Sequence, residues 1–343
     1  MRYHLNHNKI ILFAIPLLFV LYIAVQLFVS LNVKNLRVEV QIPEGANYKQ
    51  AVSILAENKL VRDKNLFLVL GKLINADKKI KAGYYTFFHR MSPLKAFRTL
   101  LAGNIIEYNV TILEGDALYE IGKKLAESKI MSEESFSSLT NDQALLQELD
   151  IDSPSLEGYL APQTYKFPKG AKPSAVLKFM VNTQRSTYPE DFEQKADKLN
   201  MTENEVLTLA SIIEREAVTN DERPLISAVF HNRLKKGMPL QADPTAIYGV
   251  KSYSQRITKE DLKRRTLYNT YVIKGLPPGA IASPGRRSIE AALNPARANY
   301  YYFVSNRDGT HKFSATLSEH NEAVKAYIDS RTNKAQQTKL SKG

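Results

Sequence analysis

Apolar residues along the chain fall into one long run and several shorter periodic segments. The long run extends from Ile10 to Val29 without a charged residue, and Lys9 and Lys34 are the nearest charges. At about 1.5 Å per residue, a helix of this length spans the hydrocarbon core of a bilayer. We therefore expect a transmembrane anchor at residues 10–31. A cleaved signal peptide or a buried core helix is the alternative, but the run is long for a signal peptide and no small-x-small site follows it.

The charges beside this run do not fix its orientation. Arg2 and Lys9 precede it, and Lys34 and Arg37 follow it closely, so the positive-inside rule favours neither side. Because the tail at residues 1–9 is short and the body is long, the simpler arrangement keeps the tail in the cytoplasm and exports the body. This predicts a single-pass protein of the inner (cytoplasmic) membrane, with its body on the periplasmic or extracellular side.

The first periodic segments form an internal repeat. Windows 42–60 and 112–130 are identical at seven of nineteen aligned positions, including the Glu-Gly pairs that end at Gly45 and Gly115. Each window follows alternating apolar and polar residues, which is typical of a strand, and the glycine then permits a turn. Apolar residues at helical spacing come next. The repeat therefore predicts two strand–turn–helix units.

Between the two copies, the sequence predicts a helix around 66–74, an aromatic strand at 84–88 and a helix from Pro93 to about Gly103. Helices mixed with short strands indicate an α+β fold. The strand–turn–helix pattern resembles a LysM module, a small glycan-binding domain, so we expect a LysM-like domain at residues 35–108. A plain α+β scaffold that holds the rest of the chain off the membrane explains the same pattern.

One helix carries candidate chemistry. Thr202-Glu-Asn-Glu205 forms a capping box, and an apolar helix follows it through Ala217. In a helical projection, Glu216 falls on the apolar arc, whereas Glu214 lies at the opposite margin. Apolar neighbours disfavour the charged form of a carboxylate, which is how a glutamate becomes a general acid near neutral pH. The alternative is a solvated glutamate at a helix end.

Several polar clusters follow this helix. His231-Asn-Arg233 ends the next helix, and Asp243 before Pro244 predicts an N-cap. Tyr268-Asn-Thr-Tyr271 leads into a rigid stretch rich in Gly and Pro, and residues 301–313 predict a β-hairpin. Each of these residues also has a purely structural interpretation: helix capping for Asp243, and packing for Tyr268 and Tyr271. Histidines are scattered without metal-ligand spacing, so we expect no metal site.

Composition narrows the class of protein. The 343 residues include no cysteine, which excludes disulfides, a thiol nucleophile and Cys-ligated metals. The net charge of +12 indicates an anionic partner: nucleic acid, a lipid surface or an acidic wall polymer. Because the sequence has no helix-turn-helix, zinc-finger or RNP pattern, we expect no nucleic acid partner.

Six motifs in one order carry a family resemblance: LASIIEREA (209–217), VFHNRL (229–234), LQADPTAIYG (240–249), YNTY (268–271), GLPPGAIASPG (275–285) and YYFV (301–304). Together they closely resemble the YceG-like family of bacterial, membrane-anchored endolytic murein transglycosylases. EGYLAPQTY (157–165) resembles the family's loop, but Ala161 and Gln163 replace the usual aromatic residue and aspartate, so Gln163 is given no role.

The resemblance implies a carbon–oxygen lyase that cleaves the β-1,4 bond from MurNAc to GlcNAc within nascent glycan strands, leaves 1,6-anhydro ends and so limits strand elongation. One glutamate is then general acid and base, and no cofactor is needed. Aligned with the Glu-Ser motif of goose-lysozyme-like transglycosylases, the acid is Glu216, with Glu214 as the fallback. The resemblance also implies a glycan-binding set: Gln241, Asp243, Thr245, Tyr268, Asn269 and Tyr271.

The expected organisation places a mainly helical catalytic domain, with a lysozyme-like active-site helix and a β-hairpin, at residues 109–330. A basic, acid-free tail at 331–343 is expected to be disordered. The expected partners are peptidoglycan glycan strands, the membrane and enzymes of cell-wall synthesis. A non-catalytic, anchored glycan-binding scaffold and a hydrolytic muramidase are the alternative functions.

Overall fold

The structure, a computed structural model, describes residues 7–340 and has a mixed α+β fold, as expected. The chain divides into two compact units. The first comprises residues 1–108 with 166–171, and the second comprises residues 109–165 with 172–343. Most of the expected cytoplasmic tail, residues 1–6, lies outside the described residues.

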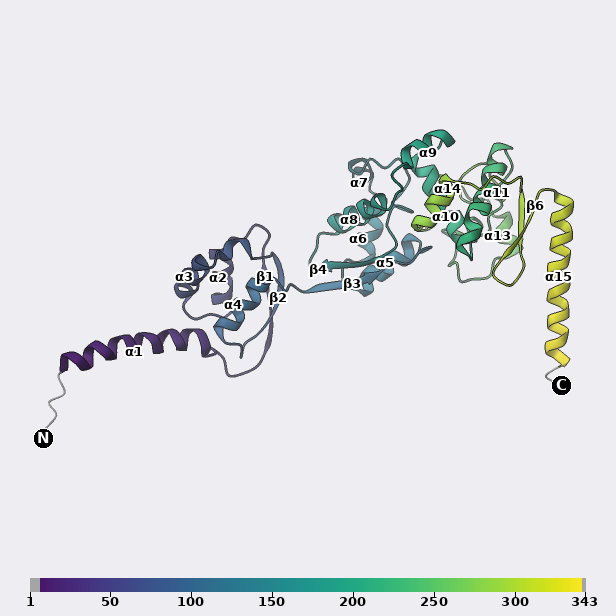
Figure 1. Ribbon diagram of the computed structural model, residues 1–343. Helices are drawn as coiled ribbons and strands as arrows, with labels where there is room; N and C mark the ends of the chain where they lie inside the picture. Colours follow the sequence, from purple (N-terminus) through teal and green to yellow (C-terminus); the bar gives the residue numbers. More distant parts are fainter. Residues whose placement is uncertain (1–6, 341–343) are drawn as a thin grey trace. The chain divides into compact units, whose positions relative to one another are not determined.

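The first unit contains a two-stranded sheet beside short helices (Figure 1). Its elements are β1 (Arg37–Ile42), α2 (Tyr48–Glu57), α3 (Lys64–Leu73), a 3-10 turn (Ala76–Lys78), β2 (Gly83–Phe88) and α4 (Pro93–Ala102). β1 and β2 pair antiparallel, with Arg37 opposite Phe88 and Ile42 opposite Gly83. Inward residues of both strands, such as Val40 and Phe87, pack with the helices into one buried core. The helix expected around 66–74, the aromatic strand and the helix from Pro93 are confirmed.

The helix α1 (His7–Phe28) covers most of the long apolar run. Its large apolar side chains are exposed, with Leu12 at 69% and Phe13 at 74%. Within residues 7–340, we find no helix that combines the length and the apolar character needed to cross a membrane. The helix expected at residues 10–31 is therefore confirmed through Phe28, but its membrane-spanning role is not.

The second unit is mainly helical. Its elements are β3 (Glu107–Thr111), α5 (Leu118–Glu127), α6 (Glu133–Thr140), α7 (Gln143–Glu148), β4 (Thr164–Pro168), α8 (Pro173–Ser186), α9 (Phe192–Leu199), α10 (Glu203–Glu216), a 3-10 turn (Asn220–Glu222), α11 (Arg223–Lys235), α12 (Asp243–Ile247), α13 (Lys259–Lys263), α14 (Arg286–Leu293), β5 (Tyr302–Ser305), β6 (His311–Ser314) and α15 (Leu317–Leu340). β3 pairs with β4, and the division between the units falls within both strands.

The internal repeat is confirmed in the backbone. β1 leads through a turn into α2, and β3 leads through a turn into α5. Gly45 and Gly115 adopt φ values of +74° and +82°, which only glycine tolerates readily. The residues after the two helices, Lys59 and Lys129, are also left-handed, with φ of 54° and 59°. The sequence identity between the copies therefore preserves two turns as well as two helices.

The helix α10 forms the centre of the second unit. Thr202 caps it, because its hydroxyl accepts the Glu205 N–H while the Glu205 side chain accepts the Thr202 N–H. Every residue from Val206 to Ile213 is buried, and α10 packs against α14, α11 and α12. A helix buried on all sides is fixed in position, so it can hold a side chain at its end in a defined place.

The expected hairpin is confirmed, since β5 and β6 pair antiparallel with Phe303 opposite Phe313. α15 follows it and packs against both strands. This helix continues to Leu340, and residues 341–343 lie outside the described residues; the disorder expected for the tail at 331–343 stays a prediction. The segment from Leu317 to Leu340 has no Gly or Pro to stop a helix.

Candidate active site

A polar pocket of about 390 Å³ lies at the C-terminal end of α10 within the second unit. It brings together four of the residues that we expected from the sequence: Glu216, Gln241, Asp243 and Tyr271. The other walls come from α11, from the segment before α12, from the β5–β6 hairpin and from α15. Segments far apart in the sequence therefore converge on the helix that carries the candidate acid.

Glu216 is the last residue of α10. Removal from water raises the pKa of Glu216 to about 8, and the negative charge of Asp243 adds to the increase. A hydrogen bond from the backbone N–H of Asp243 and the positive charge of Arg215 lower it in part. In the part of the chain that the structure describes, no salt bridge joins Glu216 to a basic side chain. A carboxyl group in this environment retains its proton at neutral pH.

Glu214, the fallback, is committed to a buried ion pair. Its carboxylate lies 2.8 Å from the Arg223 guanidinium, with side-chain exposures of 5% and 9%, and it accepts the Gly285 N–H at 2.9 Å. Arg223 also donates to Ser288 and to Asn220. Because this network joins α10 to α11 and α14, it gives Glu214 a structural position and leaves Glu216 as the glutamate of α10 that lines the pocket.

Asp243 and Tyr271 meet beside Glu216. The Tyr271 hydroxyl donates to Asp243 Oδ1 at 2.5 Å. The expected N-cap role of Asp243 is corrected, because α12 begins at Asp243 and its N-cap position is Ala242. Gln241 has φ of +50°, and its side-chain oxygen accepts from the Arg233 guanidinium at 3.3 Å. These three side chains place amide, carboxylate and phenol groups around the candidate acid.

The other expected binding residues lie away from this pocket. Thr245 is buried and donates to the Ala242 carbonyl at 2.6 Å. Asn269 is also buried; its amide donates to three backbone carbonyls in the segment before it, and its oxygen accepts the Tyr271 N–H. Tyr268 packs on Tyr248, with ring centroids 4.6 Å apart. Thr245 and Asn269 therefore stabilise the backbone of the segments that carry Asp243 and Tyr271.

The sequence reasoning left out several residues of the pocket wall. Arg233 is buried, and its guanidinium donates to the carbonyls of Leu240 and Tyr301, which ties α11 to both neighbouring segments. His311 also lines the pocket, and its Nδ1 lies 2.8 Å from a Glu222 oxygen. The polar run at the end of α11 was the sequence signal for Arg233, and the predicted hairpin was the signal for His311. That both side chains line one pocket depends on the fold.

The geometry supports acid–base chemistry on a substrate that carries hydroxyl groups. A protonated carboxyl group can donate to a leaving oxygen, and the surrounding phenol, amide and carboxylate groups can bind hydroxyls. Among residues 7–340, no group of three or more His, Cys, Asp or Glu residues is arranged to hold a metal ion.

Comparisons with known proteins agree on one family. The sequence profile of the YceG-like family matches residues 40–326. A protein of Bacillus subtilis (strain 168) named endolytic murein transglycosylase is 33% identical over 313 residues, which cover 87% of this chain and 86% of that protein. A protein of the same name from Streptococcus pneumoniae serotype 2 is 28% identical, but its match covers 59% of that protein. A 2.6 Å crystal structure of a yceG-like protein from Listeria monocytogenes has 30% identity and a TM-score of 0.58, and covers 83% of this chain and 98% of that one. The chain therefore belongs to the YceG-like family.

Proposed function

We propose that the chain is an endolytic murein transglycosylase, a lyase that cleaves the MurNAc-β-1,4-GlcNAc bond within nascent glycan strands and so limits their elongation. Membership of the YceG-like family and relatives that carry this name support the reaction class. The observation that carries the proposal is the position of Glu216, whose pKa burial raises to about 8 at the wall of a polar pocket.

Glu216 acts first as an acid and then as a base. Its proton passes to the glycosidic oxygen as the bond from C1 to that oxygen breaks, which leaves a hydroxyl on the departing GlcNAc. The 6-hydroxyl of MurNAc attacks C1, forms the new C1–O6 bond and returns its proton to the Glu216 carboxylate. No water enters the reaction, so a second carboxylate that activates water or attacks C1 is not required.

Asp243 has a supporting role in this mechanism. Its negative charge adds to the rise in the pKa of Glu216, while its own carboxylate accepts a hydrogen bond from Tyr271. The presence of a second carboxylate is also the one feature that favours the competing reaction, hydrolysis by a muramidase, because ordinary glycosidases use two. The identity of the product end separates the two reactions.

The exposed apolar side chains of α1 support a proposal for the place of action. A helix that exposes Leu12, Phe13 and Phe19 to more than 60% each needs an apolar covering. We propose that the lipid of the inner membrane provides it and that the catalytic unit works outside, beside cell-wall synthesis enzymes. The strand–helix–helix–strand order of β1, α2, α3 and β2 supports a LysM-like role for the first unit.

The test is digestion of purified, uncrosslinked glycan strands by the full chain, by Glu216→Gln and by the matched control Glu190→Gln, whose glutamate is exposed. We expect internal cleavage with ends lighter by one water from the first and third proteins only. Reducing ends would identify a muramidase. Equal binding of strands with no cleavage by any protein would identify a non-catalytic scaffold.

A further inference from the structure

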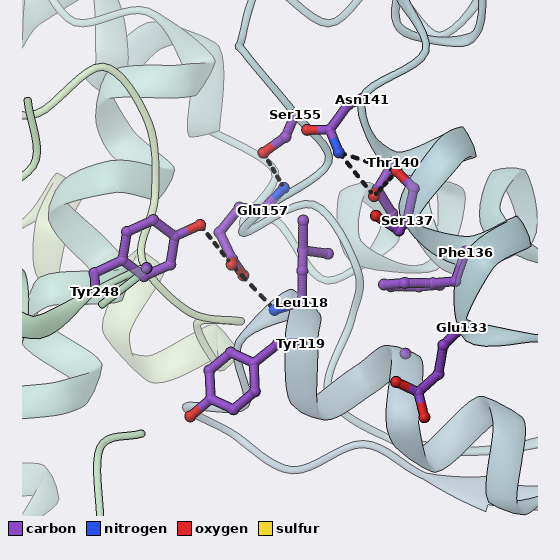
Figure 2. Close-up of a pocket in the computed structure, with 12 residues that line it drawn as sticks. Leu118, Tyr119, Glu133, Phe136, Ser137, Thr140, Asn141, Ser155, Glu157 and Tyr248 are labelled. Atoms are coloured by element: carbon purple, nitrogen blue, oxygen red, sulfur yellow. Dashed lines mark hydrogen bonds between the residues drawn. The ribbon is translucent and has the colours of Figure 1, made fainter. Parts of the chain in front are cut away.

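The second unit has another pocket, which surrounds Glu157 in the loop that precedes β4 (Figure 2). It has a volume of about 420 Å³ and lies between α5, α6 and the segment after α12. Glu216, Asp243 and Tyr271 do not line it. The mechanism proposed above uses none of its side chains, so its composition requires a separate explanation.

Glu157 is buried to 1% exposure, yet only one of its carboxylate oxygens has partners. Oε2 accepts the Leu118 N–H at 3.0 Å and the Tyr248 O–H at 2.9 Å, as the dashed lines in Figure 2 show. Oε1 is buried and, within the described residues, has no hydrogen-bond partner. Burial raises the pKa of Glu157 to about 7, because the neutral hydrogen-bond donors near its carboxylate offset the loss of water only in part.

The charge and the rings of the pocket point to a cation. Its lining has two carboxylates, Glu157 and Glu133, and among the described residues no Lys, Arg or His lines it, although the chain as a whole carries +12. Tyr119, at 49% exposure, and Tyr248 contribute aromatic rings. A carboxylate beside tyrosine faces is the arrangement that recognises an ammonium group through an ion pair and cation–π attraction.

The internal repeat provides a comparison within the same chain. Positions 48 and 52 of the first copy are Tyr48 and Val52, whose exposed fractions are 5% and 0%. The second copy has Leu118 and Gly122 at the equivalent positions. A Cβ on Gly122 would lie 2.7 Å from the Phe136 ring, so the glycine allows this ring to approach the helix. Leu118 and Gly122 both line the Glu157 pocket, so the two copies differ at positions that shape it.

We propose that the Glu157 pocket binds a primary ammonium group of the substrate, carried by the peptide stems of murein. This inference rests on the proposed function for the identity of the ligand. The Glu157 carboxylate pairs with the ammonium group through Oε1, Tyr119 and Tyr248 cover its alkyl chain, and Glu133 adds a second negative charge at the rim. A stem held here orients the attached glycan relative to the Glu216 pocket of the same unit.

The experiment measures the binding of two small probes to the full chain by saturation-transfer NMR. Nα-acetyl-lysine amide carries the free ammonium group, and Nα,Nε-diacetyl-lysine amide is its neutral counterpart. We expect the first to bind at least tenfold more tightly, which corresponds to about 1.4 kcal/mol. Glu157→Gln keeps the shape of the side chain and is expected to abolish this difference. Glu190→Gln, which removes an exposed charge of the same unit, is expected to retain it.

Equal affinity of the wild-type chain for both probes would overturn the inference, and this comparison does not depend on the folding of any variant. A second outcome would also overturn it: the chain binds the neutral sugar chitotetraose, shows no preference for the amine, and loses sugar binding in Glu157→Gln. The pocket would then be a sugar subsite. Neither lysine probe contains a glycosidic bond. A chain that binds the amine but cleaves no glycan therefore refutes the proposed function alone, whereas a chain that cleaves glycan and treats both probes alike refutes only this inference.

Discussion

Replacement of Asp243 by asparagine tests how the protein keeps Glu216 protonated. The asparagine would keep the backbone N–H that reaches Glu216 and an oxygen that can accept from Tyr271, but it would lose the negative charge. Because that charge raises the pKa of Glu216, its removal lowers this pKa. The alkaline limb of the pH–rate profile therefore moves to lower pH in Asp243→Asn.

The size of the effect follows from the pKa of Glu216. With a pKa of about 8, roughly nine-tenths of the molecules hold the catalytic proton at pH 7, against roughly 0.3% for an ordinary glutamate. A neighbouring charge shifts a pKa by about one unit or more. A fall to about 7 reduces the protonated fraction at pH 8 from roughly one half to roughly one tenth, and changes it little at pH 6.

The assay is kcat/KM for glycan cleavage at pH 6 and at pH 8. We expect the ratio of variant to wild-type rates to be about fivefold lower at pH 8 than at pH 6. Asp197→Asn, an exposed aspartate of the same unit, is the matched control and should show no such dependence. A ratio that is equal at both pH values would refute the electrostatic role of Asp243. A uniform loss of more than about a hundredfold would instead make Asp243 a direct participant, as in a hydrolase.

Three further predictions concern the helix α10 and its surroundings. Glu216→Gln should reduce cleavage by about 100-fold or more while retaining glycan binding, and equal cleavage would exclude Glu216 as the acid. Glu214→Gln should lower the free energy of unfolding by about 3 kcal/mol, because it leaves Arg223 buried without its counter-ion. The control Glu290→Gln, which breaks an exposed ion pair, should lower it by less than about 1 kcal/mol. Urea denaturation measures both values, and similar values would contradict the structural role of Glu214. Asn269→Ala should lower stability by about 1–3 kcal/mol in the same assay, since three backbone carbonyls lose a buried donor, and an unchanged midpoint would instead favour direct binding of glycan.

The sequence predicted the local elements because their signals are local. The capping box at Thr202, the turns at Gly45 and Gly115 and the alternation in the hairpin each depend on neighbours within a few residues. The projection of α10 also indicated Glu216, since a helix this regular fixes which side chains share its buried face. The continuation of α15 to Leu340 was missed because the basic composition of the tail outweighed its lack of helix breakers.

The composition of the site depended on contacts between distant segments. Asp243 meets Tyr271 across 28 positions, and the buried pair of Glu214 with Arg223 joins two helices. Asn269 has a side chain that suits glycan binding, but the fold turns it inward onto the backbone of its own segment. The periodicity of a sequence contains no information on such pairings. The sequence motifs therefore indicated which segments form the site but not the direction of each side chain.

The most direct test of the account is glycan cleavage by the full chain in water labelled with heavy oxygen. Attack by the 6-hydroxyl of MurNAc takes no oxygen from the solvent, so the new ends should be anhydro ends, lighter by one water and free of label. New reducing ends that carry the labelled oxygen would show that water attacks C1, and would contradict the single-glutamate transglycosylase mechanism.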